Sequence, residues 1–479
     1  MKRFIEGENR SQSTLFPEAL DDYIAEDNPV RVVDAFANAL DYKALGFARI
    51  DPSVTGAPAY HPAALLKIYI YGYLNRIQSS RRLEKETQRN VEMMWLTQRL
   101  SPNFKTIADF RKDNSKGIIN VCREFVGLCR QLNLFANTIV AIDGSKFKAV
   151  NSGDKNFTPV RMKLRMERVE KHIARYLAEL EDADQATPPP GKDDTDGIKK
   201  KLAKMQREMQ RLNILDHEMM NHPDKQISLT DPDARAMAST RRNSGAVCYN
   251  VQTAVDTTHH LIVAHDVTNR ATDRKELFTM SKLARTEMGS NNLTVLADRG
   301  YFSGLQILAC QQAGIEVYVP KTLTSNSTAA GRFGKPDFNY EPERNQYRCP
   351  AGDILKYRFT SVEKEKTLHT YVCPSCMSCA IREKCTTGRA RRIKRWEHED
   401  IIDAMEVELE KEPNKMGIRR QTVEHPYGTL KHWMGSTHFL TKRFKGVRAE
   451  MSLHVLAYNI KRVMKIIGIK PLMEAVQVV

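Results

Sequence analysis

The first part of the chain carries apolar positions with the period of an α-helix. After Pro62, a residue suited to a first helical turn, apolar side chains recur at spacings of four, three and four: Leu66, Ile70, Tyr73 and Ile77. Residues 79–100 predict one charged helix, and Thr106 and Asp109 stand at capping-box spacing, which predicts a further helix start. We expect a helical N-terminal domain over residues 1–135, either a DNA-binding head or a plain helical scaffold.

From residue 138 the pattern becomes that of strands interleaved with helices. Short apolar or alternating runs predict strands over 138–150, 247–255, 260–267, 293–298 and 315–321. Helical patterns cover 273–288 and 303–313, where Gly314 provides a stop. The order strand, strand, strand, helix, strand, helix, strand predicts an α/β fold in which helices flank a mixed sheet.

Two segments interrupt this predicted α/β core. Residues 158–227 contain two helical stretches separated by the breaker ATPPPGKDDTDG, and the second stretch repeats its apolar side chains like a heptad. We expect a helical hairpin there, serving DNA contact, dimerisation or simple packing. Residues 326–398 begin with a polar, Gly- and Ser-rich stretch and then carry a cluster of cysteines. The core is therefore divided into residues 136–325 and residues 399–479.

Charge and composition exclude several kinds of protein for this chain. The chain has 479 residues, with 74 Lys and Arg against 58 Asp and Glu, which gives a formal net charge of +16. No apolar run approaches the roughly 20 residues that span a bilayer, and the N-terminal MKRFIEGENR lacks the apolar stretch of a signal peptide. Membrane, secreted and collagen-like proteins are excluded. We expect a cytoplasmic, nucleoid-associated protein whose partner is nucleic acid.

Two aspartates stand at the ends of predicted buried strands. Asp143 follows IVAI and Asp298 follows TVLA. An aspartate after a strand is usually a cap or a turn residue. Two of them on neighbouring strands, however, would bring both carboxylates to one edge of a sheet, where they can share Mg²⁺. Such a site activates water and stabilises the leaving oxygen in phosphodiester chemistry.

A third carboxylate lies in a basic stretch predicted to be helical. Glu424 comes four residues after Arg420 and seven before Lys431, so all three share one helix face. This pattern places a carboxylate among cations that can hold DNA phosphates. An ordinary ion-paired surface helix is the alternative.

Four stretches, in order, resemble the insertion-sequence transposases of the DDE class, whose core is like that of RNase H and retroviral integrases. Residues 58–111 resemble the N-terminal domain, AIDGSKFKA at 141–149 the segment with the first catalytic aspartate, VLADRGYFSG at 295–304 the second, and RRQTVEHPYGTLKHW at 419–433 the helix that bears the glutamate. The signature of that helix places Arg four residues before the glutamate and Lys seven after it. The resemblance implies a catalytic triad of Asp143, Asp298 and Glu424.

The same resemblance implies a mechanism and partners. Two-metal phosphoryl transfer, with Mg²⁺ or Mn²⁺ on the triad, would cut the ends of the element and join the freed 3′-hydroxyl to target DNA. Arg420 and Lys431 are the expected phosphate contacts, with Lys146 and Arg299 as further candidates beside the aspartates. We expect a homodimer on double-stranded DNA, because two ends are cut in concert. Gly417 departs from the family, which often has a tyrosine there that handles the DNA end.

The nine cysteines fall into two groups. Four are scattered among apolar neighbours and predict buried free thiols: Cys122, Cys129, Cys248 and Cys310. Four others predict a closed structural Zn²⁺ site, as related transposases also carry: Cys349, Cys376, Cys379 and Cys385. Cys373 is an alternative ligand, because it also forms a CxxC pair with Cys376. The basic run from Arg389 to Arg395 that follows predicts a DNA-facing edge.

Two other functions share part of this pattern. A catalytically inactive or repurposed copy would still bind transposon ends through the same basic surface. A stand-alone metal-dependent nuclease would use the same core without strand transfer. The spacing of Arg420, Glu424 and Lys431 favours the transposase.

Overall fold

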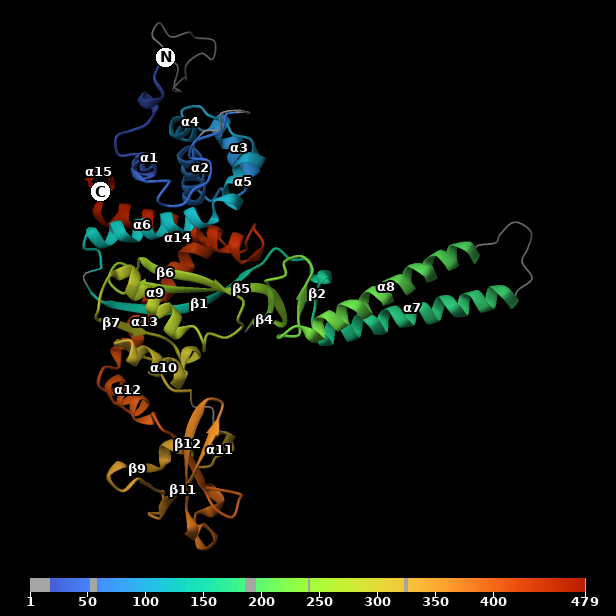
Figure 1. The fold of residues 1–479 in the computed structure, drawn as a ribbon, viewed down its shortest axis with the longest axis vertical. Coiled ribbons are helices and arrows are strands. Elements are labelled where there is room, and N and C mark those ends of the chain that lie inside the picture. Colours follow the sequence, from blue (N-terminus) through green and yellow to red (C-terminus); the bar gives the residue numbers. More distant parts are fainter. Residues whose placement is uncertain are drawn as a thin grey trace, which may run out of the picture.

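The computed structural model describes residues 18–51, 58–135, 137–185, 195–239, 242–322 and 326–478. Along the long axis of the molecule lie a helical head, a sheet flanked by helices, and a smaller strand-rich insertion (Figure 1). A pair of long helices projects sideways from the sheet. Within these residues no helix is both long and apolar enough to cross a membrane.

The head is built from short helices. They are the 3₁₀ turn η1 (Leu20–Tyr23), α1 (Pro29–Ala39), α2 (Pro62–Leu74), α3 (Ser80–Arg89), α4 (Val91–Thr97), α5 (Phe104–Asp113) and α6 (Ser115–Gln131). The predicted apolar face of α2 is confirmed as core, because Leu66, Ile70 and Tyr73 are almost completely buried.

Two helix boundaries in the head differ from the prediction. The single charged helix predicted over 79–100 is two helices, because the Asn90 side chain accepts from the amide of Met93 at 3.1 Å and starts α4 afresh. The predicted start at Thr106 is also wrong. Asn103 is the N-cap of α5, since its Oδ1 accepts from the Thr106 amide at 2.8 Å.

The sheet has the mixed topology that the sequence predicts. Its strands are β1 (Ile139–Lys148), β4 (Arg235–Ser239), β5 (Arg242–Asp256), β6 (Ile262–Thr268), β7 (Leu293–Leu296) and β8 (Ile315–Tyr318). The order is β4-β5-β1-β7-β8, and β6 also pairs with β5. β1 is antiparallel to β5 and parallel to β7, and β7 is parallel to β8. This arrangement is consistent with an RNase H-like core.

Helices from both halves of the chain surround this sheet. They are α9 (Leu277–Met288), α10 (Gly304–Gln312), α12 (Glu399–Lys411), α13 (Asn414–Gly428) with the π-turn η8 (Thr429–Trp433), and α14 (Arg443–Ile467). The last helix, α15 (Ile469–Val478), packs on α1 of the head and on α14. α6 and α14 lie between the head and the sheet (Figure 1), and α13 packs on β1, β5 and β7. One cluster of buried side chains includes Phe36 of α1, Tyr73 of α2, Val251 of β5 and Leu456 of α14. The head and the sheet therefore share a continuous core.

The projecting pair is α7 (Pro159–Gln185) and α8 (Thr195–Asn221), in the segment where the sequence predicts a helical hairpin. Two short strands, β2 (Asn156–Phe157) and β3 (Ile227–Ser228), pair at its base. The two helices bury a small core of their own, centred on Met162, Val169, Leu212, Leu215 and Met219. Most of the breaker between the helices lies outside the described residues.

The cysteine-rich insertion contains a sheet that the sequence analysis did not predict. The short helix α11 (Asn326–Ala329) comes first, and then the antiparallel strands β9 (Asn339–Glu341), β10 (Gln346–Arg348), β11 (Ile354–Glu363), β12 (Lys366–Val372) and β13 (Arg392–Trp396). A separate hydrophobic cluster supports it, including Phe338, Tyr347, Leu355, Tyr371 and Ile393. The insertion therefore has an apolar core in addition to its cysteines.

Candidate active site

The sheet register brings the two strand-end aspartates to the same edge. Ala141 of β1 pairs with Leu296 of the parallel strand β7, and Asp143 and Asp298 each follow two residues later. Asp298 caps the turn η3 (Arg299–Tyr301), where its Oδ1 accepts from the Gly300 amide at 2.8 Å. The strand ends alone thus place the two carboxylates side by side.

One arginine from α13 contacts both carboxylates. Arg419 Nη2 lies 2.7 Å from Asp143 Oδ1 and 3.8 Å from Asp298 Oδ2. The side chains of Arg419 and Asp143 are 14% and 25% exposed, so this ion pair is partly shielded from bulk water and stronger than a surface ion pair. The Asp298 side chain is 45% exposed. The sequence analysis assigned the phosphate-binding role to Arg420 and missed Arg419. The signal was its spacing of four and eight residues before Val423 and Tyr427, which marks the inward face of the helix.

The pKa of Asp143 is raised to about 6 by the combined effect of burial, which raises it, the guanidinium of Arg419, which lowers it, and the carboxylate of Asp298, which raises it. A carboxylate that is costly to ionise in its own surroundings gains from a nearby cation. The oxygen donors of the pair are also those that Mg²⁺ prefers. The two aspartates therefore fit a divalent metal ion.

Helix α13 is fixed on the sheet by side chains on either side of Glu424. Val423 packs against Ala141 and Leu296. The Tyr427 hydroxyl lies 2.7 Å from the Val251 carbonyl oxygen and 3.0 Å from that of Asp143. These contacts set the rotation of the helix about its axis and so decide which residues face the aspartates.

Glu424 is exposed and makes no hydrogen bond or ion pair within the described part of the chain. It shares a helix face with Arg420, also exposed, and with Lys431. Asp143 and Asp298 meet through Arg419, and among the described residues Glu424 takes no part in this contact. Among the described residues no group of three or more His, Cys, Asp or Glu side chains is arranged for metal binding.

Of the predicted phosphate contacts, Lys431 is held against strand β1. Its Nζ is 2.6 Å from Ser145 Oγ and 3.1 Å from the carbonyl oxygen of Lys146, and it lies over the Phe147 ring. Burial lowers the pKa of Lys431. Lys146 and Arg299 have exposed side chains next to Asp143 and Asp298 in the chain.

A further carboxylate, that of Asp273, lies within this site. The sequence analysis did not identify it as a site residue. Its Oδ1 accepts from Asn250 Nδ2 at 2.7 Å and from Gln252 Nε2 at 2.6 Å. A Cβ at Gly144 would lie only 2.6 Å from that same oxygen, so the residue after Asp143 has no room for a side chain. The sequence analysis placed Asp273 at the start of a helix over 273–288, but α9 begins at Leu277 and leaves the aspartate in a loop.

The cysteines of the insertion converge on one small cavity of about 20 Å³. Five of them line it together with Asp353 and Arg391: Cys349, Cys373, Cys376, Cys379 and Cys385. Cys373, which the sequence left as an alternative ligand, is thus as close to the cavity as the other four. Burial raises the pKa of its thiol to about 12. The four cysteines outside the insertion are buried free thiols, as predicted.

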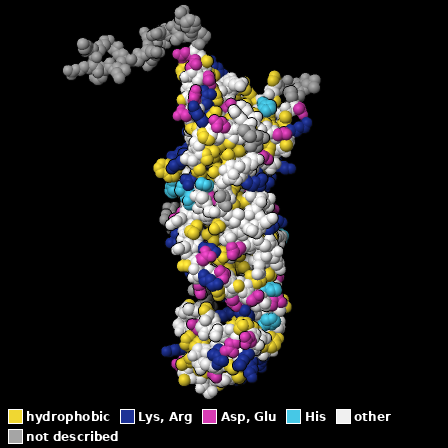
Figure 2. All heavy atoms as spheres, turned by 90° about the vertical axis from the view of Figure 1, so that its left-hand side faces the viewer, with side chains coloured by type: hydrophobic (Ala, Val, Ile, Leu, Met, Phe, Trp, Pro, Cys, Tyr) yellow, Lys and Arg dark blue, Asp and Glu magenta, His cyan; other side chains and the backbone are white. Residues whose placement is uncertain are grey.

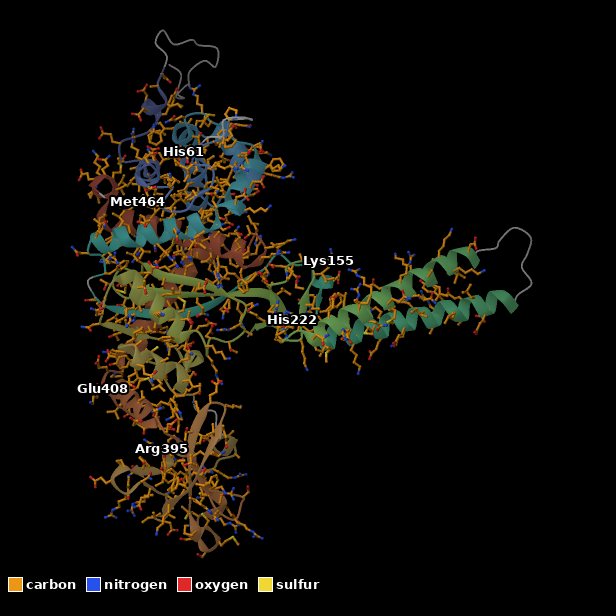
Figure 3. All side chains as sticks on the ribbon, in the orientation of Figure 1. His61, Lys155, His222, Arg395, Glu408 and Met464 are labelled. Atoms are coloured by element: carbon orange, nitrogen blue, oxygen red, sulfur yellow. The ribbon has the colours of Figure 1, made fainter. Side chains whose placement is uncertain are left out.

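Two arginines of the basic run after these cysteines turn inward, whereas Arg389, Arg392 and Lys394 are exposed, so the DNA-facing edge stays a prediction. Arg391 donates to the carbonyl oxygens of Cys385 and Phe333. Arg395 lies under α12 (Figure 3), where its Nη2 is 2.8 Å from Asp403 Oδ2. Arg391 and Arg395 turn inward because the chain pairs with β12 here as strand β13, and alternate side chains of a strand point to the same face.

Two family models of transposases match this chain. A family model described as Transposase DDE domain matches residues 207–460, and one described as Transposase domain (DUF772) matches residues 18–113. Among solved structures, the chain is similar to the cryo-EM structure of the piggyBac transposase synaptic complex with hairpin DNA. The sequence identity is 8% and the TM-score 0.29, over 94% of this chain and 79% of that chain. No curated protein matches the sequence. Because the DDE model covers more than half of its residues, the chain belongs to the family of DDE transposases, enzymes of phosphodiester cleavage and strand transfer.

Proposed function

We propose that this protein is an active transposase that binds the ends of its own element, cleaves them and joins them to target DNA. The observation that carries the proposal is the meeting of Asp143 and Asp298 at one sheet edge, under the helix that bears Glu424. The three carboxylates are the proposed metal ligands. Glu424 completes the set when the side chains of α13 rearrange around a bound ion.

Each part of the site has a proposed role. Bound Mg²⁺ or Mn²⁺ would lower the pKa of the attacking oxygen and neutralise charge at the phosphorus. Arg420 and Lys431 hold the phosphates of the scissile strand on the exposed edge of α13. Lys146 and Arg299 extend this cationic border on the side of the sheet. Buried Asn250 and Gln252 hold Asp273 in place beneath the metal ligands.

The remaining regions have proposed roles as well. The head, over residues 1–135, recognises the DNA ends, and residues 136–325 and 399–479 form the catalytic core. The insertion over 326–398 takes one Zn²⁺ in its cysteine-lined cavity. The hairpin at 158–227 contributes to a homodimer on DNA, because two ends must be cut together. Light scattering of the protein with bound end DNA tests the dimer, and a strictly monomeric complex would remove it.

An excision and integration assay tests the proposed function. The donor plasmid carries the DNA that flanks the gene, and Mg²⁺ is present. We expect Asp298→Ala and Glu424→Gln to bind the element ends and to leave the element in place. Glu410→Gln, an exposed carboxylate on the neighbouring helix α12, is the matched control and retains activity. If the wild-type protein binds ends but never cuts them, the protein is a DNA-binding protein without catalysis.

A further inference from the structure

A second hollow lies against α13 and η8, one helix edge away from the carboxylates. It has a volume of about 210 Å³ and is lined by His425, Thr429, Trp433, Tyr458, Lys461, Arg462 and Lys465. The first three follow one another at intervals of four residues and so form one stripe on α13 and η8. The other four form the facing stripe of α14. The hollow is therefore a groove between two rigid elements.

The lining of this groove is strongly cationic. Lys461, Arg462 and Lys465 are positively charged, and no acidic residue lines the hollow. Arg462 is oriented by a hydrogen bond from its Nε to the His259 carbonyl oxygen at 2.7 Å. Within the described residues, Lys461 and Lys465 are exposed and form no ion pair. On the side drawn in Figure 2, histidine and Lys or Arg side chains gather at the height of α14, between the head and the sheet. The positive electrostatic potential of such a groove attracts an anion.

The groove also presents an aromatic surface. Trp433 is 68% exposed, whereas Trp396 is 3% exposed. An indole ring that is exposed to water does not gain the favourable free energy that burial of its apolar surface provides. Beside it, Tyr458 is held by a hydrogen bond to the His260 carbonyl oxygen at 2.7 Å, and His425 stacks on the ring of His260. An exposed ring beside several cations suits a ligand with a planar apolar part and a negative charge, which is the chemistry of a nucleotide.

The position of the groove is compatible with a DNA strand that continues from the carboxylate site across α13. Arg420 and Glu424, four residues apart, share one edge of α13, whereas His425 and Thr429, which line the groove, share another. An α-helix with its side chains is about 10–12 Å across. Phosphates of stacked DNA are about 3.4 Å apart along the helix axis, and those of an unstacked strand are farther apart, so an unpaired strand crosses that width in about three nucleotides or fewer.

We propose that this groove binds an unpaired nucleotide of the DNA strand that leaves the carboxylate site. Its base stacks on Trp433, and the adjoining phosphates lie against Lys461, Arg462 and Lys465. An unpaired nucleotide is required because only an unstacked base can offer its face to an indole. The inference rests on the proposed function for the identity of the ligand, but it needs DNA binding alone and not catalysis.

A binding experiment with two DNA probes tests the proposal. The full-length protein is titrated against a blunt 20-base-pair duplex and against the same duplex with a five-nucleotide single-stranded overhang, which carries 2-aminopurine. We expect Trp433→Ala to lose about tenfold affinity for the overhang probe, as base stacking implies, and to bind the blunt probe as the wild type does. Trp433→Phe keeps most of the affinity. Quenching of 2-aminopurine on binding is strong in the wild type and weak in Trp433→Ala.

Charge variants and controls complete the test. Lys461→Gln combined with Lys465→Gln should weaken the overhang complex and reduce the slope of log affinity against log salt by about 1.4, the value for two single-strand phosphates. Tyr357→Ala removes another exposed aromatic, 46% exposed and on β11 of the insertion, and should change neither probe.

Three results would overturn the proposal. Equal loss on both probes in Trp433→Ala would mean that the groove contacts duplex backbone and not a base. Unchanged binding and quenching in both the Trp433 and the lysine variants would mean that the groove contacts another partner. Failure of the wild type to bind either probe would remove this proposal and also the proposed end binding, whereas a wild type that binds without cutting affects catalysis alone.

Discussion

Arg419 and Asp143 form the contact on which the active site is organised. Arg419 Nη2 lies 2.7 Å from Asp143 Oδ1, and the same nitrogen is 3.8 Å from Asp298 Oδ2. One buried guanidinium thus compensates two carboxylates that come from different strands. A cation shared by these carboxylates would compete with this guanidinium for their oxygens, so the arginine and a metal ion are alternatives at this position.

Replacing Arg419 should therefore lower the stability of the metal-free protein. It should also make the stability depend more strongly on a bound metal ion. In EDTA, Arg419→Gln leaves two facing carboxylates without their cation and should lose about 1.5–3 kcal/mol, the range for a hydrogen bond to a charged group. Mn²⁺ should restore more stability to the variant than to the wild type, and at lower concentration. Thermal unfolding across a Mn²⁺ titration measures both effects. Arg420→Gln, at an exposed neighbouring position, is the control. An Arg419→Gln protein as stable in EDTA as the wild type would contradict the competition.

Gly144 should be intolerant of even one added methyl group. Its Cβ would lie 2.6 Å from Asp273 Oδ1 and closer still to Gln252. Gly144→Ala should lose about 1–3 kcal/mol through overpacking, together with most strand transfer, because the shift displaces Asp143. Gly417→Ala is the matched control. Nothing lies within 4 Å of a Cβ there, so helix propensity should stabilise it by up to about 1 kcal/mol. Urea unfolding and the integration assay give the two readouts, and equal effects at both glycines would refute the steric argument.

His454 should make the fold sensitive to acid. It is fully buried on α14 against the Tyr73 ring, and burial, with a contribution from Arg111, lowers its pKa from 6.5 to about 3. Between these two values the unfolded chain binds a proton that the folded protein does not. Stability therefore falls as the pH drops below about 6.5, by up to about 1.4 kcal/mol per pH unit for this proton.

His454→Phe should remove that part of the pH dependence. Urea unfolding from pH 4.5 to 7 measures how steeply the free energy of unfolding changes with pH. In the variant, the number of protons taken up on unfolding that this slope reports should be smaller by nearly one. Some slope should remain, because burial also lowers the pKa of His265 to about 4. His217→Gln, at an exposed position on α8, should leave the slope unchanged. An unaltered slope in His454→Phe would show that this histidine does not carry the effect.

The cysteine-lined cavity should hold about one zinc per chain. Metal analysis of the purified protein tests this, and a strong chelator should lower the stability of the insertion. Single serine variants of the five cysteines identify the ligands, since four thiolates complete a structural site. We expect four variants to lose zinc and one to retain it. Cys248→Ser, at a buried thiol outside the insertion, should keep the metal. Absence of zinc from a folded protein would refute the site.

Local pattern was sufficient for much of this molecule. Alternating and continuous apolar runs predicted the strands that carry Asp143 and lead to Asp298, because the alternation of side chains across a strand is set by its own backbone. The apolar face of α2 was recoverable in the same way from helical spacing. The cysteine spacing identified the cluster, although not that Cys373 lines the cavity with the other four.

Tertiary structure alone decided the rest. The parallel pairing of β1 with β7 brought two aspartates 155 positions apart into one contact with Arg419. The rotation of α13, set by Val423 and Tyr427 against the sheet, turned Arg419 toward the aspartates and left Glu424 exposed. Asp273 entered the site only because buried Asn250 and Gln252 hold it there. The sequence by itself determined most elements of the core and of the hairpin, and the chemical groups that they carry. Which groups meet was decided by packing between elements distant in the chain, for which local periodicity holds no information.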